Sequence, residues 1–362
     1  MMIWFVAIVA LIMFVFVSVD LCVAISEWQS RIHIGKWHSR DEWKKAVLVK
    51  VSLWIKDAPT VRVTEQNRLV LWDMLCGNYR SKTIQRWQDA GLLIGGGEAV
   101  CAIYCKKHKG LFTQKEIMPE DILLAYALKK NGFLDKRIEE TILEKYKEYK
   151  DAGTLCYRSW VGNIRFVDTL GMIIPFFHAC GWDNLVKRQM EEYDEALLDG
   201  VYPAHAYDID KGLPLGVFDW ARGLGWYILA LIETDDIQGH DERILRLSEA
   251  LLKHQRNDGG YSCFVFNKRE RMESSGTVLI GLLFLTAYKL SKEARFLDAV
   301  KKIERALMGA TRRDGALDYC QGDTYGIGYY SRIFSVMPFA QGLMVKLSKQ
   351  LDTYMCEGDG KA

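Results

Sequence analysis

Acidic side chains stand at or next to the start of several apolar segments rich in glycine and alanine. Asp121 lies in EDILLAYALKKNG, Asp168 in VDTLGMIIPFFHACG, Asp219 in DWARGLGWYILALIET and Glu273 in ESSGTVLIGLLFLTAYKL. Taken singly, each is explained as a helix cap or as a first-turn acid favoured by the helix dipole. Taken together, they could supply the carboxyl proton donor that acid/base chemistry on a carbohydrate needs.

Two further motifs supply groups that such chemistry would use. HAYD contains His205 and Asp208, and DWARGLGW contains Trp220, Arg222 and Trp226. Arg222 stands among apolar and small residues, where an unpaired cation is costly, so we expect it to have a buried anionic partner. A histidine that locks a loop or the core is the alternative for His205. Tryptophan faces can stack on sugar rings, although ordinary core packing explains most of the 11 Trp.

Other kinds of chemistry find little support. The chain has no GxSxG, P-loop or HExxH motif, and the glycines of GLLIGGG lie in an apolar helical run. The net charge of +2 makes nucleic acid an unexpected partner. Cys101, Cys105 and His108 could share a helical face, but a fourth ligand is not evident, so we expect neither a metal nor a cofactor.

The apolar segments recur roughly every 50 residues and alternate with charged amphipathic segments, as helical hairpins would. Five hairpins and an earlier, compressed one around GLLIGGGEAVCAIYC would close a ring of six inner and six outer helices. The prediction is therefore an all-α protein, an (α/α)6 toroid. A toroid brings the starts of all inner helices to one mouth, where the polar residues above would meet.

The first residues predict a membrane anchor. From Ile3 to Ile25 the only charged residue is Asp20, and this length can cross a hydrocarbon layer of about 30 Å. A signal peptide would show a basic start and a small-residue cleavage site, which are not evident. Basic residues follow the span and none precedes it, so we expect a single-pass protein with a cytoplasmic body, as nine cysteines without CxxC pairs also suggest.

We divide the chain into an anchor (1–26), a connecting and first outer-helix region (27–85), the catalytic toroid (86–350) and a tail (351–362).

The motifs PEDILLAYAL, FVDTLGMIIPFF, HAYD, DWARGLGW, QRNDGGY and ESSGTVLIGLL follow one another between about Trp87 and Leu347. In this order and spacing they resemble the unsaturated glucuronyl and rhamnogalacturonyl hydrolases of glycoside hydrolase families 88 and 105, which are six-hairpin glycosidases. The resemblance implies that an acid protonates C4 of a terminal 4,5-unsaturated uronic acid on an oligosaccharide, and that water adds at C5. The hemiketal then collapses and releases the sugar.

The resemblance also implies roles for single residues. Asp168 matches the catalytic aspartate, and Asp121 matches a second aspartate that could raise the pKa of Asp168 or orient the ring. His205 and Asp208 match a motif usually written HGWD, which makes Tyr207 the aromatic sugar platform. In DWARGLGW, the expected roles are sugar stacking for Trp220 and Trp226 and pairing with the uronate carboxylate for Arg222.

The chain also departs from the family pattern. A His-Lys pair that commonly precedes the catalytic aspartate is replaced by Tyr157 and Arg158, which we expect at the substrate. Leu224 stands where an amide is usual. The family's ETSA becomes ESSG, with Ser274 and Gly276 in place of threonine and alanine. These changes remove polar sugar contacts and put the substrate in doubt.

Two other functions remain as alternatives. A catalytically silent carbohydrate-binding or scaffold protein of a polysaccharide-handling system would fit the membrane anchor and the substituted residues. The turns QRNDGGY and RRDGAL also occur in toroidal terpene cyclases and prenyltransferases. The nearest approach to their acidic metal motif is Asp235 with Asp236, which lacks a third acid.

Overall fold

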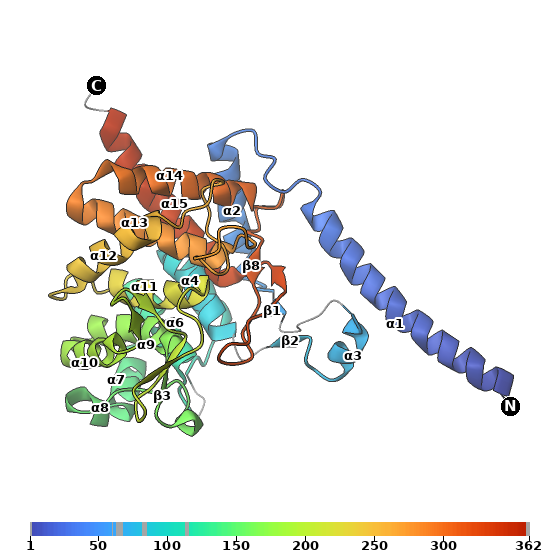
Figure 1. Ribbon diagram of the computed structural model, residues 1–362, viewed down its shortest axis with the longest axis horizontal. Coiled ribbons are helices and arrows are strands. Elements are labelled where there is room, and N and C mark those ends of the chain that lie inside the picture. Colours follow the sequence, from blue (N-terminus) through green and yellow to red (C-terminus); the bar gives the residue numbers. More distant parts are fainter. Residues whose placement is uncertain (1, 60, 63–67, 82–84, 113–115, 360–362) are drawn as a thin grey trace.

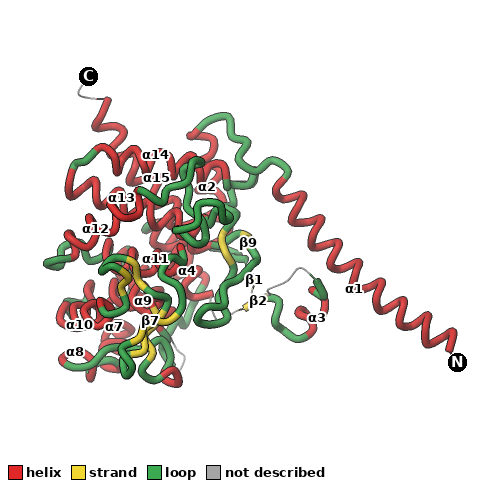
Figure 2. Tube along the Cα trace, in the orientation of Figure 1, coloured by secondary structure: helices red, strands yellow, loops and turns green. Residues whose placement is uncertain are grey.

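The computed structural model describes residues 2–59, 61–62, 68–81, 85–112 and 116–359. This part of the chain contains fifteen α-helices, one 3-10 helix (Ser159–Val161) and nine strands of two or three residues. Figure 2 shows that helices build the body, while strands and long loops gather at one side of it.

Six helices form a closed inner ring. Each of them packs on the next one along the chain, and the last packs on the first. Their faces toward the ring are almost wholly apolar and buried, which is what holds the ring together. They are α4 (Gln85–Gly96), α6 (Pro119–Lys130), α9 (Val167–Ala179), α11 (Ala221–Ile232), α13 (Ser274–Ser291) and α15 (Pro338–Asp359).

The remaining helices of the body lie outside this ring (Figure 1). The alternation of apolar and amphipathic helices confirms the predicted all-α toroid, including the compressed first hairpin of α4 and α5. The outer helices are α2 (Arg40–Trp54), α5 (Glu98–Lys107), α7 (Lys136–Lys145), α8 (Glu148–Asp151), α10 (Asp183–Asp194), α12 (His240–Leu252) and α14 (Ala294–Gly309).

The ring closes where α15 crosses α4, and glycines permit this contact. A Cβ at Gly95 would lie 1.6 Å from the carbonyl oxygen of Gly342, and a Cβ at Gly91 would lie 2.4 Å from Cα of Phe339. Because such distances are impossible for real side chains, the glycines of GLLIGGG allow the two helix backbones to touch. Their presence in a helix is therefore explained by ring closure.

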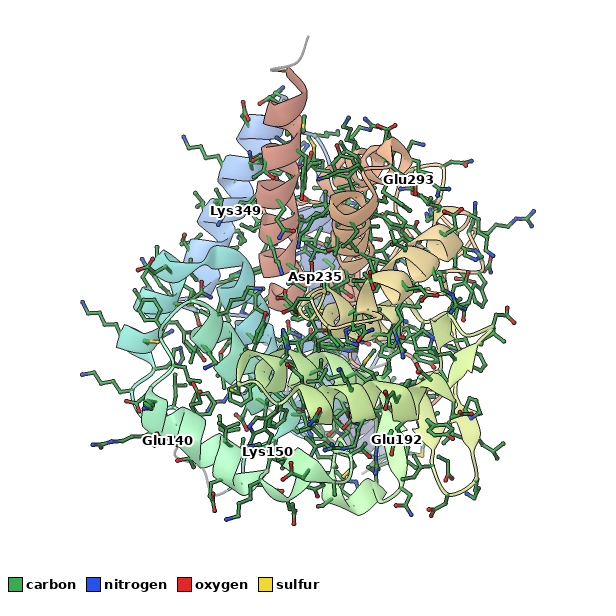
Figure 3. All side chains as sticks on the ribbon, turned by 90° about the vertical axis from the view of Figure 1, so that its left-hand side faces the viewer. Glu140, Lys150, Glu192, Asp235, Glu293 and Lys349 are labelled. Carbon is green, nitrogen blue, oxygen red and sulfur yellow. The ribbon has the colours of Figure 1, made fainter. Side chains whose placement is uncertain are left out.

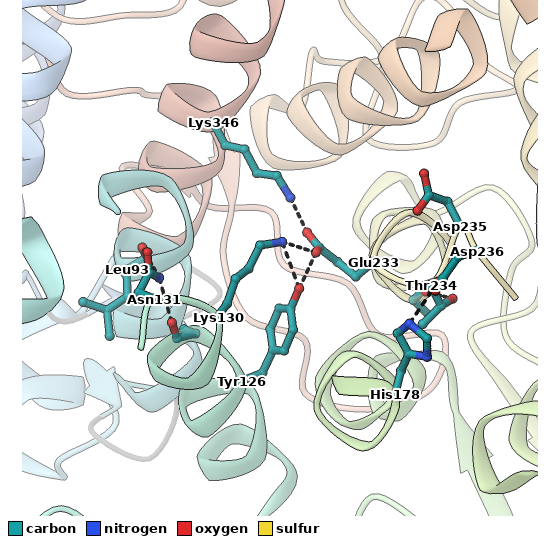
Figure 4. A network of polar contacts seen from close by, with 12 residues as sticks. Leu93, Tyr126, Lys130, Asn131, His178, Glu233, Thr234, Asp235, Asp236 and Lys346 are labelled. Carbon is teal, nitrogen blue, oxygen red and sulfur yellow. Dashed lines mark hydrogen bonds and ion pairs between the residues drawn. The ribbon is translucent and has the colours of Figure 1, made fainter. Parts of the chain in front are cut away.

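A buried carboxylate joins three inner helices at their other end. Glu233, which caps the C-terminus of α11, forms ion pairs with Lys130 of α6 and Lys346 of α15 and accepts a hydrogen bond from Tyr126 (Figure 4). The two ammonium groups outweigh the effect of burial and hold the pKa of Glu233 down at about 2. This end of the ring is thus closed by a salt-bridge network.

Short strands were not anticipated, because two or three residues are too few to show a period of two. They form antiparallel pairs, and three of them make a small sheet in the order β3-β6-β7 that pairs Phe166 with Ala206. The strands are β1 (Val61–Arg62), β2 (Arg80–Ser81), β3 (Ile164–Phe166), β4 (Leu197–Leu198), β5 (Tyr202–Pro203), β6 (Ala206–Asp208), β7 (Leu213–Leu215), β8 (Cys320–Gln321) and β9 (Phe334–Ser335). Since β3 runs directly into α9, this sheet sets where α9 begins.

The N-terminal helix α1 (Met2–Arg31) extends away from the body and buries none of its residues (Figure 1). It is long and apolar enough to cross a membrane, a test that a signal sequence also passes. Helix α13 passes the same test, but most of it is buried in the ring. Beside α1 lies a short helix, α3 (Val70–Leu75), which packs on it.

Candidate active site

Asp168, the second residue of α9, lies at the mouth of the ring. The strand β3 delivers it there, and the amide of the preceding residue, Val167, donates to the carbonyl of His205 at 3.0 Å. Oδ2 of Asp168 is buried and accepts no hydrogen bond from any described residue. Nε2 of His205 lies 3.8 Å from it. The backbone pairing of the two segments therefore brings an acid and an imidazole together.

Burial raises the pKa of Asp168 to about 7, although the positive charge of Arg222 opposes the rise. The nearby carboxylates of Asp323 and Glu120 raise it further by like-charge repulsion. A carboxyl group with this pKa is protonated in a large fraction of molecules near neutral pH. Asp168 can thus donate a proton under ordinary conditions.

His205 is buried and held in one tautomer by Tyr330. Burial and the charge of Arg222 lower the pKa of His205 to about 4, so the ring is neutral. The amide of Val217 donates to the Tyr330 hydroxyl at 3.3 Å, and this hydroxyl lies 3.1 Å from Nδ1 of His205. The hydroxyl can accept from Val217 and donate its own proton to Nδ1; in that tautomer the ring proton resides on Nε2, the nitrogen that faces Asp168.

Arg222, in the first turn of α11, holds a loop over the mouth. Its guanidinium donates to the carbonyls of Gln321 and Gly322, the latter at 2.6 Å, and its centre lies 5.1 Å from the Trp220 ring. Nε1 of Trp220 donates to Oε1 of Gln321 at 2.9 Å. We expected anionic partners for Arg222, and Asp168 and Asp323 are these partners. They interact with it electrostatically, because the positive charge of Arg222 lowers the pKa of both carboxyl groups. Its direct bonds go to carbonyls, so the guanidinium is not free in this structure, and its pairing with a uronate carboxylate stays a prediction.

The same loop is fastened to α13 by Glu273. This carboxylate is fully buried and accepts from the amides of Ser275, Gly276 and Gln321 at 3.0, 2.6 and 3.1 Å. Ser274, next to it, is buried as well, and its Oγ has no hydrogen-bond partner among the described residues. The Ser274 hydroxyl is therefore a buried polar group without a partner among the described residues, and its contact with a substrate stays a prediction.

Asp168, His205, Glu120 and Asp323 form a cluster of interacting side chains. Within this cluster, Glu120 is bound by Tyr157 and Arg158, the two residues that depart from the family pattern. Tyr157 donates to its Oε1 at 2.7 Å, and Arg158 donates to both of its oxygens, at 2.5 and 3.2 Å. The charge of Glu120 acts on Asp168 and on Asp323. Tyr157 and Arg158 thus take part in the site by binding a carboxylate of the protein.

Asp121 has a different position from the one expected. Its Oδ2 accepts from the amide of Met118 at 3.0 Å, which caps α6, and its Oδ1 lies 3.4 Å from Arg86. The neighbouring Glu120 has the electrostatic contact with Asp168 that we had assigned to Asp121. The two positions differ because successive residues of a helix point in directions about 100° apart.

Two predicted aromatic contacts also differ. Trp226 is buried in the ring between Trp87 and Phe339, at 5.5 and 4.9 Å between ring centroids, so it has no free face for a sugar. Trp220 is buried under Tyr330, 5.2 Å away. Both tryptophans are therefore packing residues in this structure.

The rest of the HAYD motif turns away from Asp168. Tyr207 has Glu192 and Glu195 of the α10 region as its charged neighbours, and burial raises its pKa. Asp208 accepts from the amide and the ammonium group of Lys211, at 3.2 and 2.9 Å. This bond lowers the pKa of Asp208 and ties the turn between β6 and β7. Of the motif, only His205 contacts the cluster.

A cavity of about 410 Å³ adjoins the cluster. Tyr330 and Gln321 line it on the side of the cluster, and Phe264, Arg271 and Phe334 line it elsewhere. Tyr330 lines this cavity and its ring also lies 5.4 Å from the His205 ring, so the cavity adjoins the imidazole. The cavity is the candidate entrance for a substrate.

The sequence analysis did not single out Glu120, Gln321, Asp323 or Tyr330. Three of them lie in QGDTYGIGYY, a run of glycines and tyrosines between two helices, and that composition was a signal for a loop with a binding role. In the part of the chain that the structure describes, no three His, Cys, Asp or Glu residues gather closely enough to hold a metal ion.

No protein-family model matches the chain, and no curated protein does. Solved structures do. A possible family GH105 member from Klebsiella pneumoniae has a TM-score of 0.65 at 13% identity, with 88% of this chain and 95% of the other covered. The unsaturated glucuronyl hydrolase of Bacillus sp. GL1, described as responsible for glycosaminoglycan degradation, has a TM-score of 0.60 at 14% identity, with 85% and 95% covered. An unsaturated glucuronyl hydrolase specific for heparin has 0.62 at 14%, with 88% and 98% covered. The resemblance to families 88 and 105 is thereby confirmed as a likeness of fold.

Proposed function

We propose that this protein is a glycoside hydrolase that removes a terminal 4,5-unsaturated uronic acid from oligosaccharides by hydrating the C4=C5 bond. The observation that carries the proposal is the carboxyl group of Asp168, whose Oδ2 is buried without a hydrogen-bond partner among the described residues and whose pKa is about 7. The likeness of fold to unsaturated glucuronyl hydrolases supports the same chemistry.

The reaction begins when protonated Asp168 gives its proton to C4. The π electrons of the double bond form the new C–H bond, and the positive charge that develops at C5 is shared with the ring oxygen. Water then adds at C5 and gives a proton back to the Asp168 carboxylate. The resulting hemiketal collapses and releases the adjoining sugar. One residue thus serves first as acid and then as base, which a pKa near neutrality permits.

His205 supports the charged form of Asp168 during this cycle. Its Nε2–H points to Oδ2 at 3.8 Å and can approach the carboxylate once the proton has left. Because the pKa of His205 is about 4, the imidazole stays neutral and does not compete as a proton donor. Its role is to orient the carboxylate and water.

Substrate reaches Asp168 through the cavity beside Tyr330. Arg271 is a cation of this cavity, placed 4.6 Å from the Phe334 ring, and it can attract the negative charge of a uronate. If Arg222 is to meet the uronate carboxylate as well, it must exchange its bonds to the Gln321 and Gly322 carbonyls for that contact.

The helix α1 is proposed to anchor the protein in a membrane, with the body on the cytoplasmic side. Two contacts support its retention in the mature chain. Asp20 within α1 accepts the amides of Leu69 and Val70, both at 2.8 Å. Arg31 at its end bonds the buried carboxylate of Asp318 at 2.7 and 2.9 Å. Cleavage of α1 as a signal sequence would remove the first of these contacts.

The test is the loss of ultraviolet absorbance of the conjugated C4=C5 bond when lyase-generated oligosaccharides meet the detergent-solubilised full chain. We expect a decay on at least one oligosaccharide, and its loss in Asp168→Asn. Binding of the same oligosaccharides by calorimetry without any decay would support the silent carbohydrate-binding alternative. Neither decay nor binding would contradict both functions.

A further inference from the structure

The segment beside α1 presents apolar side chains to solvent. In and next to α3, Leu69, Trp72, Met74 and Leu75 are 49, 59, 41 and 70% exposed, although α3 is only six residues long. Val70 is fully buried and lies on the face of α3 whose backbone contacts α1. Four large apolar side chains on one short segment form an exposed hydrophobic patch, and such a patch marks an interaction site.

Asp20 fixes the segment around α3 to α1 at a defined position along the axis of α1. Its two carboxylate oxygens accept the amides of Leu69 and Val70, which are the unpaired donors at the start of α3. A carboxylate with both oxygens bonded to amides has a structural function. The one acidic residue within the apolar run of α1 is thereby explained: it holds α3.

The length of α1 places Asp20 at the edge of a bilayer. Met2 to Val19 is uninterrupted by charge and spans about 27 Å at 1.5 Å per residue, close to a hydrocarbon thickness of about 30 Å. If these residues cross the membrane, Asp20 stands where hydrocarbon gives way to headgroups. Arg31, where α1 meets the body, stands about 16 Å farther along the axis. The segment attached to Asp20 then lies at the level of the headgroups, between the bilayer and the body (Figure 1).

We propose that Leu69 to Leu75 is a second membrane contact, an interfacial segment whose apolar side chains enter the lipid surface beside α1. Tryptophan and leucine are the side chains that such segments use, because an indole ring prefers the boundary between headgroups and acyl chains. The lipid surface is the occupant that the structure favours, since the exposed face is continuous with α1, whose residues are exposed to the same surroundings. With two contacts the body cannot rotate freely about α1.

This inference rests on the proposed membrane anchor and not on the proposed chemistry. The experiment uses the full chain in phosphatidylcholine nanodiscs, with a photocrosslinking amino acid at one position at a time, as in Trp72→p-benzoylphenylalanine. Phe14 of α1 reports on the span itself. Leu290 is the matched control, an exposed apolar residue next to Lys289, which pairs with Asp235 on the face that points away from α1 (Figure 3).

We expect lipid adducts at positions 14 and 72 and several-fold fewer at position 290. Asp20→Ala should cut the adduct at position 72 several-fold and leave the adduct at position 14 unchanged, because α1 still spans while α3 loses its two bonds. Lipid adducts at position 14 but none at 72 would overturn the interfacial contact alone, as would adducts at 72 to a second copy of the chain. No lipid adduct at position 14 would overturn the anchor and this inference together. An adduct at 72 that persists undiminished in Asp20→Ala would contradict the role of Asp20.

Discussion

Nε2 of His205 lies 3.8 Å from Oδ2 of Asp168, and the other ring nitrogen of His205 contacts Tyr330. Tyr330 occupies Nδ1 of the imidazole, and burial keeps the ring neutral with a pKa of about 4. Burial also keeps Asp168 protonated up to about pH 7. An acid that can still lose its proton therefore faces an N–H that can stabilise the anion.

The first prediction concerns the pH dependence of hydration. Asp168 must be protonated to act on C4, so kcat/KM should fall about tenfold per pH unit above about 7. His205 must be neutral, so the rate should also fall below about pH 4. Rates of absorbance loss across pH 3 to 9 check the profile. A rate that stays constant from about pH 6 to 9 would contradict Asp168 as the proton donor.

The second prediction concerns stability. The pKa of Asp168 is about 7 in the folded protein and 3.8 ordinarily, so its contribution to stability is complete below 3.8 and is lost as pH rises through 7. Asp168→Asn does not titrate. Relative to the wild type, the variant should therefore gain up to about 4 kcal/mol of unfolding free energy between pH 4 and pH 8. Denaturant unfolding of both proteins at the two pH values measures this difference. An equal difference at both would mean that burial does not raise this pKa.

The third prediction separates two neighbouring acids. The negative charge of Glu120 raises the pKa of Asp168, and Tyr157 and Arg158 donate hydrogen bonds to Glu120. Asp121 instead caps α6. Glu120→Gln should move the upper limb of the pH profile to lower pH, because a negative charge near Asp168 is lost. The matched variant Asp121→Asn keeps an oxygen acceptor for the Met118 amide and should leave the profile in place. A shift in the second variant alone would restore Asp121 to the catalytic role that the family resemblance implied.

The fourth prediction concerns Tyr330. In Tyr330→Phe the hydroxyl between the Val217 amide and Nδ1 of His205 is lost, so the imidazole is no longer held as one tautomer. We expect kcat to fall about tenfold or more, with a smaller change in KM. Tyr288→Phe is the control, since Tyr288 packs on Tyr354 at the end of α13 that is opposite Glu273. Equal kinetics of both variants with wild type would show that the hydroxyl does not position His205.

The fifth prediction links the N-terminal helix α1 to the site. Arg31 bonds the fully buried carboxylate of Asp318 and the carbonyl of Phe334, which adjoin the strands β8 and β9 at the two ends of the loop over the mouth. Arg31→Ala should cost about 1–3 kcal/mol of unfolding free energy in detergent, because Asp318 loses one of its two cations, and should lower activity. Lys50→Ala removes a pair with the exposed Asp314 and should cost less than about 1 kcal/mol. If both variants cost the same, α1 is not mechanically coupled to the loop.

Much of the architecture could be predicted from the sequence, because it depends on periodic patterns. The apolar segments that begin near Asp168, Asp219 and Glu273 are indeed inner helices, and the run with Asp20 is indeed one long exposed helix. An α-helix has 3.6 residues per turn, so apolar residues that recur at this period lie on one face of the helix. The sequence pattern therefore predicts which face the fold buries. That Asp168 and His205 belong to one site was predicted from the order of motifs. Their contact with each other was not predicted, and the three-stranded sheet shows how the fold brings them together.

The direction of single side chains was decided by the tertiary structure. Sequence alone could not show that Glu120 instead of Asp121 turns to Asp168. Both are acidic residues at the start of the same helix, and only the fold determines what lies opposite each of them. Nor could it show that Arg222 is bonded to the Gln321 and Gly322 carbonyls, residues about a hundred positions away. Periodicity determined which helices exist and which face each buries. The long-range backbone contacts of a closed ring determined which polar groups meet at its mouth, because those contacts join segments that the sequence keeps far apart.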